Sequence, residues 1–441
     1  MKLPDFTFQL ATRIEFGEGY LSHAGAEAKK LGITKAMVIA DKGIIACGIV
    51  APIEASLKAE GVDYVIYDQI VPNPRDIHCI AGAEFAREHG IDGMIAIGGG
   101  SSMDTAKAVG TLLANGGNIR TWATPAVLEH PIVPLIAVPT TAGTGSEVTF
   151  DAVITDTEAH EKLNILDIKI APKVALVDPT VLKGLPEKAM ASTGVDALIH
   201  AVEAYTCKAA SPVTDAFALY AIDLIGANIR EAVYQRTPES CKAMMLGSTM
   251  AGVAFGYSDV AAVHCIAEAL GGRYDTPHGV SNAMVLSTVT EFNIPANTEK
   301  YAEVARHLGV DTTGMTEEEA AASMCSRLPE RLHEQAHLLV DRWDRPILPV
   351  PGMAELVREL KEAGYGVYLL SNASYRQHEY WPRVPGSEYF DGTLISADVK
   401  LIKPCAEIYE LLYSTLPPLS ACFSTIRLRT SRARSVPVCR A

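Results

Sequence analysis

Short, almost uninterrupted apolar runs alternate with helical stretches over roughly the first 185 residues. The runs cover residues 36–41, 62–68, 93–100, 134–141 and 174–179. Strands that are apolar on both faces are typical of parallel sheets covered by helices on both sides. Intervening segments, such as 102–114, have the apolar spacing of a helix. The pattern predicts a doubly wound α/β domain whose ligands bind at the carboxyl ends of the strands.

The pattern changes twice more along the chain. From residue 186 to about 322 it predicts a second, all-helical domain. A new α/β alternation begins near residue 324, with an amphipathic helix in AELVRELKEAG and a strand in YGVYLLSNAS. The predicted divisions are residues 1–185, 186–323, 324–423 and 424–441. The last segment has five arginines, no acidic residue and no periodicity, so we expect a disordered tail. Translation in a shifted reading frame would account for its composition.

Composition narrows the range of partners. Among 441 residues, 48% are hydrophobic and 20% charged, which excludes general disorder. A formal net charge of −14 disfavours nucleic acid and anionic membranes as main partners. No signal-peptide pattern and no apolar run of about 18 residues occurs. The nine cysteines are widely spaced and form no CxxC motif, so we expect a cytoplasmic protein without a disulfide framework.

A glycine-rich turn follows the third apolar run. Gly98, Gly99 and Gly100 stand between that run and the helix expected at 102–114. Glycines allow close backbone approach, and a helix start offers N–H groups and partial positive charge to a diphosphate. The GxGxxG fingerprint is not met, because Met103 occupies the third glycine position. A tight turn without a ligand is the alternative.

The ends of two further apolar runs carry polar side chains that can bind a nucleotide. Thr140, Thr141, Thr144 and Ser146 can bond ribose or phosphate oxygens, or else cap the next element. Asp41 ends the run at 36–41. A carboxylate there can accept a bond from an adenine-ribose hydroxyl and would repel a 2′-phosphate, which favours NAD over NADP. A solvated loop carboxylate is the alternative.

Four residues of the helical region form a candidate metal site. Asp196 and His200 are four residues apart, which places both on one face of a helix. His264 and His278 are the other two histidines between residues 184 and 290. One carboxylate and three imidazoles suit Fe²⁺ or Zn²⁺, which can polarise a carbonyl oxygen or stabilise an alkoxide. Together with the nucleotide signals, this predicts hydride transfer at a metal-held alcohol or aldehyde. Ordinary core histidines are the alternative.

These motifs together resemble the iron-containing, or group III, alcohol dehydrogenases over about residues 5–322. The likeness is carried by GGGSSMDTAK, PTTAGTGSEVT, VDPTVLKGLPEKAMASTGVDALIHAVEAYT and VHCIAEALGGRYDTPHGVSNAM. It implies a Rossmann-like NAD-binding domain, a helical metal-binding domain, a small alcohol or aldehyde substrate and often a homo-oligomer. It implies that the catalytic metal is held by Asp196, His200, His264 and His278. It implies coenzyme contacts from Asp41, Asn73, Gly98, Gly99, Gly100, Ser101, Thr140, Thr141, Thr144 and Lys162.

The chain departs from that family at two positions. Many members have a histidine with a proton-relay role where this chain has Glu268, and some have a coenzyme-side asparagine where it has Asp151. Two other hypotheses remain open beside a dehydrogenase. One is a non-redox enzyme on the related dehydroquinate-synthase-like scaffold. The other is an inactive fusion product in which only the first domain folds.

The segment after about Ser323 resembles part of a haloacid dehalogenase-like hydrolase. Ser371-Asn372 and Lys403-Pro404 match that family's phosphate-holding second and third motifs. The DxD nucleophile motif is absent, since Asp341 and Asp344 have neither its spacing nor its strand. Without the nucleophile no phosphoryl-enzyme can form, so we expect no phosphatase activity.

Overall fold

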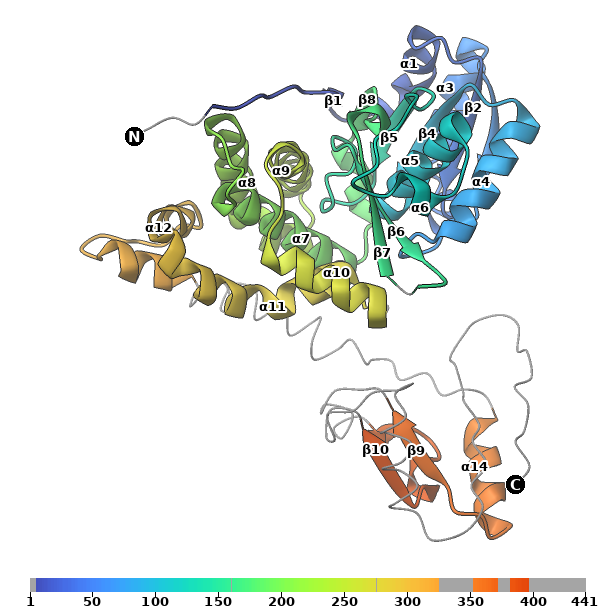
Figure 1. Cartoon of the computed structure of the whole chain (residues 1–441), viewed down its shortest axis with the longest axis vertical. Helices are drawn as coiled ribbons and strands as arrows, with labels where there is room; N and C mark the ends of the chain where they lie inside the picture. The colour runs from blue at the N-terminus through green and yellow to red at the C-terminus, as the bar shows by residue number, and fades with distance from the viewer. Residues whose placement is uncertain (1–4, 160, 275, 325–351, 372–380, 396–441) are drawn as a thin grey trace. The chain divides into compact units, whose positions relative to one another are not determined.

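The computed structural model describes residues 5–159, 161–274, 276–324, 352–371 and 381–395. The chain divides into two compact units, Met1–Asp341 and Arg342–Ala441. The first unit contains a sheet with its covering helices and a group of longer helices (Figure 1).

A six-stranded, all-parallel sheet forms the beginning of the first unit. Its order is β1-β8-β5-β4-β2-β3. The strands are β1 (Arg13–Phe16), β2 (Lys35–Ala40), β3 (Asp63–Tyr67), β4 (Gly93–Gly98), β5 (Leu135–Pro139) and β8 (Val174–Val177). All five predicted runs are therefore strands of one parallel sheet. Strand β1 was not predicted, because its four half-exposed residues at the sheet edge form no apolar run.

Helices cover both faces of this sheet, as its doubly apolar strands require. In β2, Ala36 and Val38 join the core that includes α1 and α3, whereas Met37 and Ile39 join the core beneath α4 and α5. All four side chains are fully buried. The helices of this part are α1 (Ala24–Lys30), α2 (Lys42–Ala46), α3 (Ala51–Glu60), α4 (Asp76–His89), α5 (Gly100–Asn115) and α6 (Ile119–Trp122).

A two-stranded antiparallel hairpin stands apart from the main sheet. Its strands are β6 (Asp151–Asp156) and β7 (Glu161–Leu166). Burial alternates residue by residue along β6, which is the period of a strand covered on one face. The hairpin was not predicted, because neither of its strands is a continuous apolar run. It contacts α5 through β6 and α10 through β7, so it borders the space between sheet and helices.

The second part of the first unit is helical, as predicted. Its helices are α7 (Glu187–Thr206), α8 (Pro212–Tyr234), α9 (Pro238–Tyr257), α10 (Ala262–Tyr274), α11 (His278–Asn293) and α12 (Thr298–His307). Side chains of α7, α8 and α9 share one continuous core with the α1 and α3 side of the sheet. No single helix in the described ranges is long and apolar enough to cross a membrane. A bent pair, Pro238–Tyr257 with Ala262–Gly271, meets the length and composition only when both helices are combined across a 99° bend.

The second unit is described only in part. Helix α14 (Met353–Glu362) precedes β9 (Tyr368–Ser371), which pairs in parallel with β10 (Gly392–Ile395). The helix and the first strand lie where the sequence predicts them. Asn372, Lys403 and Pro404 lie outside the described residues, as do Asp341, Asp344 and the tail at 424–441, so the likeness to a hydrolase stays a prediction there.

The loop after β5 meets α9 at a contact between two glycines. A Cβ at Gly252 would stand 2.8 Å from both the Cα and the carbonyl oxygen of Gly145. Gly145 itself has a φ of +62°, in the left-handed region. This close backbone approach holds the sheet's loop against the helical part.

We therefore expect Gly252→Ala to lower the free energy of unfolding by about 1–3 kcal/mol, because backbone atoms cannot yield to the new methyl group. Gly184→Ala is the matched control, since a Cβ there meets nothing within 4 Å, and we expect a change within about 0.5 kcal/mol. Urea denaturation of the three proteins measures both effects. Equal stability of the two variants would contradict the contact.

Candidate functional site

The carboxyl ends of β2, β4 and β5 meet at one edge of the sheet. Ala40 of β2 is level with Ile97 of β4, and Gly98 of β4 is level with Pro139 of β5. After β2 the chain forms β3 on one side of β2, and it then forms β4 on the other side of β2. The direction of strand addition therefore reverses between β2 and β4, which flank the topological switch point. Ligands of open α/β sheets bind in the crevice at such a point.

The glycine turn lies at this edge, directly before α5. Gly98 has a φ of +151°, and a Cβ there would stand 2.2 Å from the Ser102 hydroxyl oxygen. A Cβ at Gly100 would stand 2.9 Å from the Thr144 methyl group. The first residue before the helix, Gly99, supplies no capping side chain. Because these glycines have no side chain, the loop that carries Thr144 can pack against the turn. The N-terminus of α5 stays accessible to an anion.

Asp41 follows β2 at the same edge and caps the short helix α2. Its Oδ1 accepts hydrogen bonds from the backbone N–H groups of Gly43 and Ile44, at 2.7 and 3.0 Å. Both bonds use one carboxylate oxygen. Asp41 is therefore more than a solvated loop carboxylate, because its side chain also caps a helix.

One cavity joins this edge to the helical part. It is lined by residues of the glycine turn and threonine loop, of the hairpin, and of α7, α10 and α11. Of the residues predicted from the sequence, its lining contains Asn73, Gly100, Ser101, Thr144, Ser146, Lys162, Asp196, His200, His264 and His278. Asp41, Gly98, Gly99, Thr140 and Thr141 do not line it. They lie at the adjoining strand ends or in the loop that follows β5.

Lys162 and Asn73 meet on the hairpin side of the cavity. The Lys162 ammonium donates to the Asn73 amide oxygen at 3.3 Å and to the Thr155 hydroxyl at 2.9 Å. Asn73 has a φ of +54°, a conformation that asparagine tolerates better than most residues. The two residues are 89 positions apart in sequence, and only the fold brings them together.

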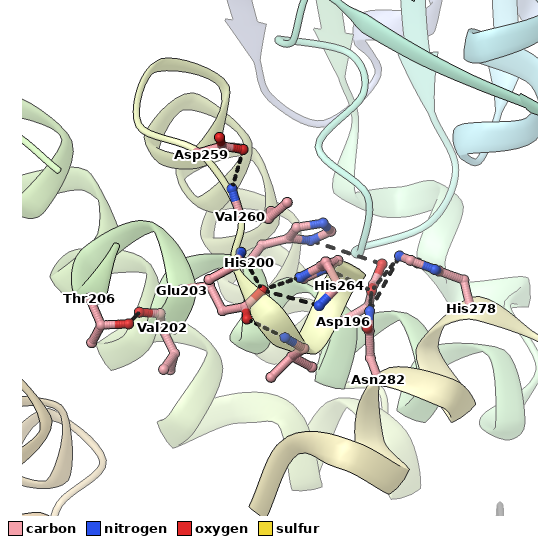
Figure 2. Close-up of polar contacts among 12 residues, drawn as sticks. Asp196, His200, Val202, Glu203, Thr206, Asp259, Val260, His264, His278 and Asn282 are labelled. Atoms are coloured by element: carbon pink, nitrogen blue, oxygen red, sulfur yellow. Dashed lines mark hydrogen bonds and ion pairs between the residues drawn. The ribbon is translucent and has the colours of Figure 1, made fainter. Parts of the chain in front are cut away.

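The four candidate metal ligands converge at the other end of the cavity. One nitrogen or oxygen atom from each of the four side chains lies within 4.8 Å of the others. The Asp196 Oδ1 is 3.7 Å from His264 Nε2 and 3.6 Å from His278 Nε2, and its Oδ2 is 4.0 Å from His200 Nδ1. Figure 2 shows the His200, His264 and His278 side chains directed toward Asp196. Three of the side chains are buried, while that of His278 is 36% exposed. The cluster therefore opens on the side of His278.

The cluster contains an ionised carboxylate and a neutral imidazole, both of which can bind a cation. Burial would raise the pKa of Asp196, but the three imidazoles hold it well below its usual range, so the carboxylate is ionised. Burial lowers the pKa of His200 to about 3, which keeps that ring neutral. Burial would also lower the pKa of His264, but the neighbouring carboxylates of Asp196 and Glu203 raise it to about 9, so a metal ion would have to replace a proton of this ring.

Two ring nitrogens of the cluster have no hydrogen-bond partner within the described part of the chain. They are His200 Nδ1 and His264 Nε2, and both are buried. Burying a polar atom without a partner costs free energy, so such atoms are rare in stable structures. A divalent cation held between them and the Asp196 carboxylate would satisfy both nitrogens. The donor set and its geometry therefore fit a metal ion.

Several residues that support the site were not predicted. Glu203 accepts a hydrogen bond from His264 Nδ1 at 2.5 Å, and Asn282 donates to Asp196 Oδ1 at 2.7 Å. Glu203 could have been found, because it lies seven residues after Asp196 and so shares its helix face. Asn282 likewise lies four residues after His278.

A buried lysine and a partly buried aspartate of α5 hold the loop after β5 against that helix. The fully buried Lys107 ammonium donates to the Ser146 hydroxyl at 2.8 Å and to the Asp151 carbonyl at 2.8 Å. Ser146 in turn donates to Asp104 Oδ1 at 2.7 Å. Ser146 thus serves this network, and it was not recognised as such from the sequence.

Comparison with known proteins shows the family of the chain. The model of the iron-containing alcohol dehydrogenases matches residues 11–179, and that of the C-terminal domain of the same family matches residues 190–340. The NAD-dependent methanol dehydrogenase of Bacillus methanolicus is 37% identical over 341 residues, 77% of this chain and 86% of that protein. The 1,3-propanediol dehydrogenase of Citrobacter freundii is 40% identical over 309 residues, 69% of this chain and 80% of that protein. The structure of an alcohol dehydrogenase from Oenococcus oeni aligns with a TM-score of 0.73 at 36% identity, over 82% of this chain and 94% of that one.

The chain belongs to the iron-containing alcohol dehydrogenase family, and it has the α/β and helical parts that the motifs predicted. The family match reaches residue 340, beyond the boundary at residue 323 that the sequence suggested. Residues 325–340 are not among those that the structure describes.

The partly buried Asp104 should give the protein a characteristic pH dependence. Burial raises its pKa from 3.8 to about 6. Because the folded-state pKa exceeds the unfolded one, Asp104 contributes stability that is present below about pH 4 and lost by about pH 6. We expect Asp104→Asn to reduce the decline in the free energy of unfolding over that range. Urea titrations of both proteins at several pH values measure it, and parallel pH profiles would rule this role out.

Proposed function

We propose that the chain is a metal-dependent, NAD-linked dehydrogenase that interconverts a small primary alcohol and its aldehyde. The observation that carries the proposal is the cluster of Asp196, His200, His264 and His278 in the wall of a cavity that also reaches the glycine turn. Membership in the iron-containing alcohol dehydrogenase family supports the same activity.

The four clustered side chains would hold the metal. One carboxylate oxygen and three imidazole nitrogens suit Fe²⁺, and also Zn²⁺. When bound, such an ion polarises an alcohol or carbonyl oxygen. His278, the exposed member, stands where the cluster meets the cavity and therefore where a substrate would enter.

The edge of the sheet would hold the coenzyme. The N–H groups at the start of α5 suit the diphosphate, and the hydroxyls of Thr140, Thr141 and Thr144 lie in the adjoining loop. Asp41 uses only Oδ1 to cap α2, so its Oδ2 can accept a bond from the adenine ribose. Asn73 and Lys162 line the stretch of cavity between this edge and the histidines, where the nicotinamide half of NAD would lie.

Charge in the cavity favours a neutral substrate. Glu268, which replaces the relay histidine, and Asp151 both line it, and burial raises the pKa of Glu268. Lys162 is the one lysine or arginine in the described lining, and it already donates to Asn73 and Thr155. A polycarboxylate substrate would meet like charge there. This argues against the non-redox alternative on a dehydroquinate-synthase-like scaffold.

The first experiment tests the metal and the activity together. We expect the protein loaded with Fe²⁺ to oxidise NADH with short neutral aldehydes. His278→Ala should remove most bound metal and nearly all turnover, because a ligand is lost, while NADH still binds. His307→Ala is the matched control, since His307 lies on α12 and pairs with Asp223. Metal analysis, NADH fluorescence titration and initial rates are the measurements. Full turnover by the His278 variant, or an inactive iron-loaded wild-type protein, would refute the proposal.

The second experiment tests the coenzyme preference. We expect NADH to be preferred over NADPH, because Asp41 would face the 2′-phosphate, at a cost of about 1–3 kcal/mol. Asp41→Asn removes the charge and keeps a side chain that can still cap α2, so it should narrow the ratio of kcat/KM values for NADH and NADPH without loss of stability. Thermal unfolding verifies the stability. Equal kcat/KM for the two coenzymes in the unaltered protein would show that Asp41 does not discriminate.

A further inference from the structure

We propose that Glu203 is a positioning residue for the metal, acting through His264 and through the docking of α10 on α7. This inference rests on the proposed function, because it concerns the affinity of the same metal site. Glu203 would not bind the ion itself. Its carboxylate would fix which nitrogen of His264 faces the cluster and where that nitrogen stands.

The carboxylate of Glu203 is buried and fully engaged. Its Oε1 accepts from the Val263 backbone N–H at 2.7 Å, and its Oε2 accepts from the Ala261 N–H at 3.0 Å and from the His264 N–H at 3.4 Å. The Glu203 side chain is only 5% exposed. These donors lie at the start of α10, so a single side chain from α7 binds the N-terminus of a second helix. A negative charge at that position is favoured by the helix dipole.

The same carboxylate determines the state of the His264 ring. His264 Nδ1 lies 2.5 Å from Glu203 Oε2, and a carboxylate can only accept, so Nδ1 carries the proton. Its Nε2 is left facing Asp196 Oδ1 at 3.7 Å, without a hydrogen-bond partner among the described residues. Figure 2 shows Glu203 and Asp196 on opposite sides of the His264 ring. Glu203 therefore directs Nε2 toward the other ligands.

One helix supplies both the first ligands and this orienting group. Asp196, His200 and Glu203 follow one another on one face of α7 at spacings of four and three residues. Docking α10 on Glu203 brings His264 to the carboxylate of Asp196. Removing the charge should therefore weaken metal binding even though all four ligands remain, as loss of a carboxylate partner of a ligating histidine commonly does.

The test measures metal affinity directly, with Co²⁺ as the probe and a competing chelator. We expect Glu203→Gln to raise the Kd for Co²⁺ by about 10–100-fold and to alter the visible absorption spectrum of the bound ion. Thr237→Ala is the matched control, because it removes the hydroxyl that caps α9 in the same helical part and contacts none of the ligands. It should leave the Kd and the spectrum unchanged.

A double-variant comparison separates positioning from a general loss of stability. In a His264→Ala background, where the oriented ring is gone, Glu203→Gln should have little further effect on the Kd. An equal penalty in both backgrounds, or an unchanged Kd in the single variant, would overturn the inference. If Glu203→Gln does not fold, Glu203→Asp retains the charge with a shorter reach, and an unaltered Kd for that variant would equally overturn it. Failure of the unaltered protein to bind Co²⁺ would instead refute the proposed function.

Discussion

Burial of the Asp196 carboxylate among three imidazoles is the constraint on which the helical part of the structure depends. An isolated buried charge is costly, so the surrounding groups must compensate for it. Asn282 donates to this carboxylate, and the rings of His200 and His264 stack with centroids 4.2 Å apart. Two of the ring nitrogens have no hydrogen-bond partner among the residues that the structure describes, and a cation would satisfy both. Helices α7, α10 and α11 therefore meet both through apolar packing and at this polar cluster.

The position of this cluster relative to the sheet depends on the loop that follows β5. Gly145 approaches α9 at Gly252, while Ser146 connects the loop to Asp104 and Lys107 of α5. The same loop carries Thr144, which packs against Gly100 at the start of α5. One short segment thus touches the helix whose N-terminus suits a phosphate and the helical part that carries the metal-type ligands. A hydride transfer needs the two reactants held in a fixed relative position, and this loop provides the connection.

Like Asp196, Glu203 is a buried carboxylate of α7 that binds groups from another helix. It ties the start of α10 to α7 and orients a ligand with one carboxylate. Its contribution differs from that of Glu268, which is on the same helix as His264 and lines the cavity. The Glu203 carboxylate is fully used in hydrogen bonds within the protein. The Glu268 carboxylate lines the cavity in which a substrate would bind.

The sequence by itself determined five of the six strands of the parallel sheet, the helical second part and the four side chains that cluster in it. Continuous apolar runs, glycines before a helix and the i, i+4 pair of Asp196 and His200 are local signals, and a local signal needs no knowledge of the fold. The strand β1 and the β6–β7 hairpin were missed because one is a short edge and the other alternates in polarity. Only the tertiary structure decided that Lys162 meets Asn73 and that Glu203 holds His264. Those partners are 89 and 61 residues apart, and contacts over such separations arise from the packing of whole helices and strands rather than from any pattern along the chain.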